Sequence, residues 1–302
     1  MVENADLLRQ SEKLNNNSRF AVVTSTFYRE WTVSQSGNPV SADQIRGDLA
    51  IETLRLAKDK GYQLVVVDGG SSREFVASLE KLGITVSKEK ERGMSPSRQQ
   101  GFKEATVLSG VDTICWTEPE KISMVENLQE AARPILENQA DIVVPARTTQ
   151  SLESYPDQQA VSEQRLNYYF NKVLRLTGLL SKESPDFDVA FGPRIFKNEP
   201  TIVELFTRQY RLRENSQLSE RVKPNNYSNA TFFPLILALE RKLRVVSVPV
   251  PYVHPKVQTE FEKGSKEFER KRISQKQDIV RGAIELARYL IDNPQKPSEL
   301  LE

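Results

Sequence analysis

The chain has 302 residues, 38% of them hydrophobic and 27% charged, which is enough apolar material for a sizeable core and argues against disorder of the whole chain. The 42 basic residues nearly cancel the 41 acidic ones, leaving a formal net charge of +1. Without a strong overall field, the protein is not expected to bind nucleic acid.

The cysteine content and the lack of long apolar segments indicate the cellular compartment of the protein. The single cysteine, Cys115, cannot form an internal disulfide or a cysteine-based zinc site, which indicates a reducing environment. The N-terminal residues lack an apolar stretch long enough for a signal peptide, and no segment approaches about 18 continuous apolar residues. We therefore expect a cytoplasmic protein. The sequence leaves the oligomeric state open, with a homodimer among the alternatives.

The predicted elements alternate between strands and helices from residue 20 onward. Short β-branched segments predict strands at residues 20–25, 63–67, 84–87, 113–116, 142–145 and 245–250. Apolar residues three and four positions apart predict helices at residues 49–60, 73–82, 97–108, 122–137 and 165–176. This alternation predicts an α/β fold with a doubly wound, mostly parallel sheet flanked by helices. Ligands bind such sheets beyond the carboxyl ends of the strands, so candidate site residues should follow each strand.

Three parts are predicted along the chain. Residues 1–18 are polar and predict a flexible leader. Residues 19–262 carry the α/β domain. Residues 263–302 predict a C-terminal helical extension with many charges and a weak apolar stripe.

Polar residues follow the first two predicted strands. The first strand runs into a polar loop that contains Thr24 and Tyr28, and the Tyr28 ring offers a stacking face for a base. The second strand ends at Asp68, which is followed by Gly-Gly-Ser-Ser. Its carboxylate can accept a hydrogen bond from the imide of uracil or the edge of guanine. The alternative is an Asx-type turn that leads into a helix.

A basic helix start follows the third predicted strand. Ser-Pro-Ser at residues 95–97 places backbone amides at a helix N-terminus, and Arg92 and Arg98 lie beside it in the sequence. Such a terminus suits a pyrophosphate. The alternative is an ordinary solvated helix start with charged flanks.

Two glutamates follow the fourth predicted strand. Glu118 and Glu120 are separated by Pro119, and together they can share a divalent cation with a diphosphate. The alternative is a helix start, where acidic residues and proline are both favoured.

The only histidine, His254, lies just beyond the last predicted strand and is a further candidate for the site. Lys266 follows in a Gly-Ser-Lys turn that can approach phosphate oxygens. The alternatives are a structural histidine and a flexible basic hinge.

Taken in this order, residues 19–270 resemble the GT-A glycosyltransferases, especially members similar to family 2. The resemblance implies a nucleotide-sugar donor, a UDP- or GDP-sugar, with Asp68 on the base and Arg98 near the base or the diphosphate. It also implies an Mg²⁺ or Mn²⁺ ion, with Glu118, Glu120 and His254 as candidate ligands. Thr24, Tyr28, Arg92 and Lys266 complete the predicted nucleotide-sugar contacts.

The sequence departs from the family pattern in two places. Glutamates replace the aspartates of the family's metal motif. Many inverting relatives carry an acidic pair before the last strand, where one carboxylate deprotonates the acceptor, but residues 225–234 contain no carboxylate. Either the base comes from elsewhere, with Asp186 and Asp188 as the nearest candidates, or the enzyme retains anomeric configuration and needs no such base. The histidine after the last strand, similar to that of retaining glycerate-type sugar transferases, favours retention.

The predicted activity is therefore metal-assisted transfer of a sugar to an acceptor, which is either a small molecule or a lipid-linked compound. Two alternatives remain. A non-catalytic nucleotide-sugar-binding protein would keep the fold without the chemistry. A sugar-1-phosphate nucleotidyltransferase is disfavoured because the loop after the first strand lacks glycine.

Overall fold

The computed structural model describes residues 17–33, 41–210, 231–262, 270, 284 and 291–292. The predicted leader and C-terminal extension, including Lys266, lie almost wholly outside these residues. Within the described part of the chain, no helix is long and apolar enough to cross a membrane.

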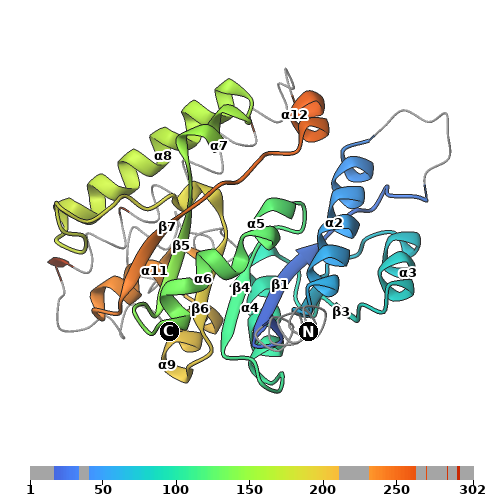
Figure 1. The fold of residues 1–302 in the computed structure, drawn as a ribbon, viewed down its shortest axis with the longest axis horizontal. Coiled ribbons are helices and arrows are strands. Elements are labelled where there is room, and N and C mark those ends of the chain that lie inside the picture. Colours follow the sequence, from blue (N-terminus) through green and yellow to red (C-terminus); the bar gives the residue numbers. More distant parts are fainter. Residues whose placement is uncertain are drawn as a thin grey trace, which may run out of the picture.

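A seven-stranded sheet lies at the centre of the described residues, in the order β3-β2-β1-β4-β6-β5-β7 (Figure 1). The strands are β1 (Phe20–Thr26), β2 (Gln63–Asp68), β3 (Val86–Lys88), β4 (Thr113–Trp116), β5 (Ile142–Arg147), β6 (Arg194–Lys197) and β7 (Val245–Val250). Neighbouring strands pair in parallel except at β6, which is antiparallel to both β4 and β5. The predicted mostly parallel α/β sheet is confirmed.

Helices connect the strands, and α2, α3 and α7 begin at a side-chain cap. They are α2 (Ala42–Asp59), α3 (Arg73–Lys81), α4 (Met94–Thr106), α5 (Ile122–Glu126), α6 (Leu128–Leu136), α7 (Thr149–Glu153), α8 (Asp157–Leu176), the 3-10 helix η1 (Val189–Phe191), α9 (Pro200–Thr207), α11 (Phe233–Glu240) and α12 (Lys256–Glu262). Before α2 and α3, the hydroxyls of Ser41 and Ser72 accept from backbone N–H groups of the first turn. Such caps satisfy donors that the helix itself leaves unpaired.

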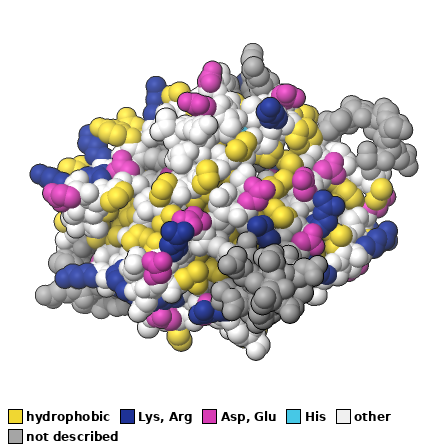
Figure 2. Space-filling model, viewed as in Figure 1, with side chains coloured by type: hydrophobic (Ala, Val, Ile, Leu, Met, Phe, Trp, Pro, Cys, Tyr) yellow, Lys and Arg dark blue, Asp and Glu magenta, His cyan; other side chains and the backbone are white. Residues whose placement is uncertain are grey.

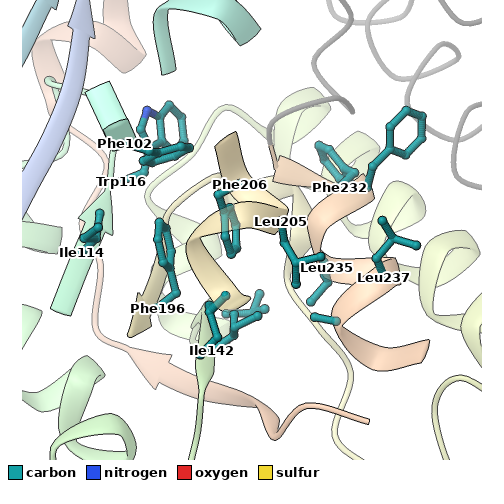
Figure 3. Close-up of a cluster of buried hydrophobic side chains, with 14 of the residues drawn as sticks. Phe102, Ile114, Trp116, Ile142, Phe196, Leu205, Phe206, Phe232, Leu235 and Leu237 are labelled. Atoms are coloured by element: carbon teal, nitrogen blue, oxygen red, sulfur yellow. The ribbon is translucent and has the colours of Figure 1, made fainter. Parts of the chain in front are cut away.

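Both faces of the sheet are covered. Successive side chains of a strand point to opposite faces, so Ala21 and Val23 of β1 pack into a cluster with helices α4, α8, α9 and α11. Phe20 and Val22 pack on the other face with α5 and α6. In the first cluster the rings of Phe196 and Phe206 stack with centroids 4.0 Å apart (Figure 3). A sheet buried on both faces leaves its strand ends as the accessible edge.

Strand β6 was not predicted from the sequence. Its first residue, Arg194, is fully buried, and its guanidinium donates to the carbonyl oxygens of Pro193 and Val189. An arginine and a preceding Gly-Pro interrupt the apolar pattern that marks the other strands. The neighbouring backbone thus accepts hydrogen bonds from both terminal nitrogens of this buried guanidinium.

Candidate functional site

A cavity of about 600 Å³ lies at the carboxyl ends of the parallel strands β1 and β4. Ser25 and Thr26 of β1 and Trp116 of β4 form one part of its wall, beside the first turns of α4. The wall also includes residues of α2, α8, η1 and α12, of the loops after β1 and β4, and of the segment after β7. This is the edge at which α/β sheets bind ligands, and the volume suits a small molecule.

Tyr28, Arg46 and Glu120 form a connected group on the wall. The Tyr28 hydroxyl donates to Glu120 Oε1 over 2.8 Å, and Arg46 Nη2 lies 2.6 Å from the same oxygen. Burial and the neighbouring Glu120 carboxylate raise the pKa of Tyr28 well above its ordinary value, so its hydroxyl remains a donor. Glu120 likewise raises the pKa of Arg46. One oxygen of Glu120 is therefore committed to two protein partners.

Glu118 and Lys121 form a second pair on the wall, with Lys121 Nζ 3.7 Å from Glu118 Oε2. The same ammonium lies 4.6 Å from the centre of the Phe191 ring and 5.2 Å from that of Tyr252. Burial alone would lower the pKa of Lys121, but Glu118 and other nearby charges together hold it above its ordinary value. Within the described residues, Glu118 Oε2 is buried and accepts no hydrogen bond.

The basic residues predicted at the start of α4 both line the cavity. Arg98 is buried, and its guanidinium carbon lies 3.9 Å from the centre of the Trp116 ring, in a cation–π contact. Arg92 is exposed at the rim. Below them, the Ser97 hydroxyl donates to Ser25 Oγ over 2.9 Å and joins α4 to the end of β1.

Asp68 forms an Asx-type turn, which the sequence offered as the alternative to contact with a base. Its carboxylate accepts from the Thr26 hydroxyl over 2.8 Å, the Gly70 amide over 2.9 Å, and the amide and hydroxyl of Ser71. Asp68 is buried and is not part of the cavity wall, and neither is the fully buried Thr24. The structure therefore gives Asp68 a local role in shaping the loop, and its predicted contact with a base stays a prediction.

His254 lies on the cavity wall in a fixed orientation. Its amide donates to the Ser154 hydroxyl over 2.9 Å, and its Nδ1 lies 2.7 Å from Thr259 Oγ1. The ring centre is 4.3 Å from that of Tyr155. Ser154 and Tyr155 lie directly after α7, and Thr259 belongs to α12, so the histidine links these two parts of the chain.

Asp188, a candidate base, lies in a buried ion-pair network behind the cavity. Arg147 donates to both of its carboxylate oxygens, over 2.7 and 2.8 Å, and also contacts Glu163. Asn167 donates to Asp188 Oδ1 over 2.6 Å. Burial alone would raise the pKa of Asp188, but hydrogen bonds and charge from Arg147 hold it below its ordinary value. A carboxylate stabilised in this way is a poor proton acceptor.

The other candidate base, Asp186, is largely exposed and pairs with Arg175. Neither Asp186 nor Asp188 is part of the cavity wall. The placement of both aspartates therefore gives no support to their predicted role as catalytic bases.

The three predicted metal ligands, Glu118, Glu120 and His254, all line the same cavity. Nevertheless, no three His, Cys, Asp or Glu side chains among the described residues form a group that could hold a metal ion. Glu120 is held by Arg46 and Tyr28, which leaves Glu118 Oε2 as the carboxylate oxygen best placed for an added cation.

Several wall residues were not predicted as site residues. Arg46 and Lys121 supply positive charge, while Tyr155, Gln159 and Glu163 come from α8 and the turn before it. Lys121 directly follows the predicted glutamate pair, and Gln159 and Glu163 are four residues apart on one helix face. These local patterns were available in the sequence, whereas the packing of α2 and α8 at the same edge was not.

The comparisons with known proteins agree with this fold. The model for "Glycosyl transferase family 2" matches residues 48–201. The chain belongs to this family. It is therefore a glycosyltransferase, as the sequence resemblance predicted. No curated protein matches the sequence.

Solved structures share the fold. Mannosyl-3-phosphoglycerate synthase from Rubrobacter xylanophilus aligns with a TM-score of 0.54 and 15% identity, over 96% of this chain and 79% of that one. Glucosyl-3-phosphoglycerate synthase from Mycobacterium tuberculosis, in complex with Mn²⁺, UDP and glucosyl-3-phosphoglycerate, aligns with a TM-score of 0.51 and 10% identity, over 92% of this chain and 81% of that one. At such low identity the likeness extends to the fold alone.

Proposed function

We propose that this glycosyltransferase transfers a hexose from a nucleoside-diphospho-sugar, with a UDP-sugar as the leading donor and a GDP-sugar as the alternative. The proposal rests on the cavity at the carboxyl ends of β1 and β4. Its wall includes five cationic residues, Arg29, Arg46, Arg92, Arg98 and Lys121. The Mycobacterium tuberculosis synthase with this fold binds UDP and, in another complex, UDP-glucose. A uridine diphosphate is therefore the first donor to test.

The cationic side chains would act on the leaving group. Negative charge grows on the nucleoside diphosphate as the sugar–phosphate bond breaks, and fixed positive groups stabilise that charge in a partly enclosed site. Glu120 and Glu118 offset part of the charge of Arg46 and Lys121. Arg98 is held against Trp116 and is therefore well placed to face a ligand without rearranging.

A divalent cation fits this site only with help from the substrate. Mg²⁺ is often held by one or two carboxylates together with substrate phosphates and water. Glu118 would supply the protein carboxylate, because its Oε2 accepts no hydrogen bond within the described residues, and His254 is a nearby candidate on the wall. When bound, the ion would add Lewis-acid stabilisation of the departing diphosphate.

The acceptor is proposed to be a small phosphorylated hydroxy acid. Both synthases of similar fold are named for 3-phosphoglycerate as the group that carries the sugar. Arg29 and Arg92 on the wall provide charges that suit an anionic acceptor. A lipid-linked acceptor is the alternative.

We favour retention of anomeric configuration. Neither aspartate that the sequence offered as a base lies on the cavity wall, and three glutamates of the wall, Glu118, Glu120 and Glu163, are ion-paired. Retention requires no separate base to deprotonate the acceptor. Proton NMR of the isolated product distinguishes the two outcomes by the anomeric coupling constant.

The experiment that tests donor class is a thermal-shift panel of UDP, GDP, UDP-glucose and GDP-mannose, each with and without Mn²⁺. A ligand that binds the native state raises the midpoint of unfolding with its concentration. We expect a shift for one nucleotide family, and a Glu118→Gln variant that loses the Mn²⁺-dependent part of that shift. If no nucleotide shifts the wild-type midpoint, the cavity is not a nucleotide-sugar site.

A further inference from the structure

Trp116 Nε1 and Gln159 Oε1 are among the buried polar atoms of the cavity wall that have no hydrogen-bond partner within the described residues. Both side chains are deeply buried, with 2% of Trp116 and 7% of Gln159 exposed, and both line the cavity. Folded proteins rarely leave buried polar atoms unpaired, because the lost hydration is not recovered. Where such atoms border a cavity, a ligand that fills the cavity is a natural partner.

The orientation of the Gln159 amide is set by its neighbours. Its Nε2 donates to Glu163 Oε1 over 3.0 Å, and the other oxygen of Glu163 contacts Arg147. A carboxylate paired with arginine can only accept, so the amide nitrogen must face Glu163 and the amide oxygen must face away. Arg147 is fixed in turn by Asp188. The network behind the cavity thus presents Gln159 Oε1 as an acceptor.

The neighbours of Trp116 also fix the position of its side chain. It is the last residue of β4, paired with Val23 of β1 on one side and Arg194 of β6 on the other. Arg98 lies over its ring. The indole N–H is a donor and never an acceptor. Gln159 and Trp116 therefore offer the cavity one fixed acceptor and one fixed donor.

A hydroxyl group both donates and accepts, and a sugar carries several of them. We propose that Gln159 Oε1 and Trp116 Nε1 bind hydroxyl groups of the transferred sugar and determine which sugar is accepted. This inference rests on the proposed function. Trp116 belongs to the strand that leads to Glu118, where the diphosphate is proposed to bind, and the sugar is bonded to that diphosphate. Sites built to pair with a substrate hydroxyl reject analogues that lack it far more strongly than apolar pockets do.

The variants Gln159→Met and Trp116→Phe test the assignment. Methionine keeps the length of glutamine without the acceptor, and phenylalanine keeps a ring for Arg98 without the N–H. Binding of UDP and of UDP-glucose is measured by isothermal titration calorimetry, with GDP and GDP-mannose used if the wild type prefers guanine. Each variant should weaken UDP-glucose binding about tenfold or more while the Kd for UDP changes less than about twofold.

Gln139→Met serves as the matched control, because Gln139 is an exposed glutamine just after α6 and lies outside the cavity wall. It should leave both Kd values unchanged. Ligand-free thermal unfolding checks that the two cavity variants fold. A further readout is turnover with 2-deoxy-2-fluoro, 3-deoxy and 4-deoxy donors, where each variant should discriminate less than the wild type against at least one analogue.

The inference is overturned if UDP and UDP-glucose binding weaken in parallel, if neither changes, or if the only effect is a higher KM for the acceptor. Failure of the proposed function looks different: the wild type itself then binds none of UDP, GDP, UDP-glucose and GDP-mannose, and transfers no sugar.

Discussion

Replacing Arg147 with methionine should destabilise the fold strongly. The Arg147 side chain is 1% exposed, and the side chains of its partners Asp188 and Glu163 are each 10% exposed. Methionine retains most of the volume but leaves two buried carboxylates without their cation. Breaking a buried pair from one side costs about 3–5 kcal/mol. For a chain of this size, that corresponds to a fall of roughly 5–15 °C in Tm.

The assay is urea unfolding followed by circular dichroism at pH 7, and Arg175→Met is the matched control. Arg175 also pairs with an aspartate, Asp186, but the two side chains are 27% and 61% exposed. Exposed pairs contribute about 0–1 kcal/mol, so the control should be nearly neutral. Equal losses in the two variants would refute the argument that burial determines the importance of the Arg147 network.

Three further outcomes are expected. Gly192→Ala should reduce turnover at least tenfold, because φ is +102° at Gly192 and a Cβ would overlap the Glu118 carboxylate. The control Gly178→Ala, with φ +71° and open space around the new Cβ, should lose only about 1–3 kcal/mol of stability. Equal activities in the two variants would contradict this. Burial raises the pKa of the Cys115 thiol, so a disulfide reagent should not label the native protein but should label one thiol per chain after unfolding in guanidinium. Rapid labelling of the native protein would contradict this. Hydrogen bonds from its cationic neighbours lower the pKa of Asp141 below its ordinary value of about 3.9, so its stabilising effect is present above that pH and is lost as the pH falls further. In urea titrations, Asp141→Asn should therefore differ from the wild type most at pH 7 and progressively less below about pH 4, whereas a constant difference would be contrary to this linkage.

The sequence predicted the sheet well where its strands are continuous apolar runs. The strands at 113–116 and 245–250 have the predicted bounds, because they are short and rich in β-branched residues. Helix α8 begins eight residues before its predicted start at 165, since its first two turns are mostly polar and carry little apolar periodicity. Strand β6 was missed because a buried arginine opens it.

The site was predicted in outline, since residues after several strands do converge on one cavity. The partners of individual charged groups could not be predicted. Arg46 meets Glu120 because α2 packs beside α5, and Arg147 meets Asp188 because β5 packs against η1. Both pairs join residues distant in sequence, so they depend on tertiary packing that no local pattern encodes.

The central claim is that the cavity binds a nucleoside-diphospho-sugar and catalyses transfer. The most direct measurement is mass-spectrometric detection of released UDP and of a glycosylated product from UDP-glucose and 3-phosphoglycerate, with GDP-mannose in parallel. The account predicts turnover by the wild type and by Arg133→Met, whose arginine is exposed on α6, and a loss of about 100-fold or more in Arg98→Met. A wild-type protein that binds the donor but leaves it intact for hours with Mn²⁺ present would contradict the claim and would favour a nucleotide-sugar-binding role without catalysis.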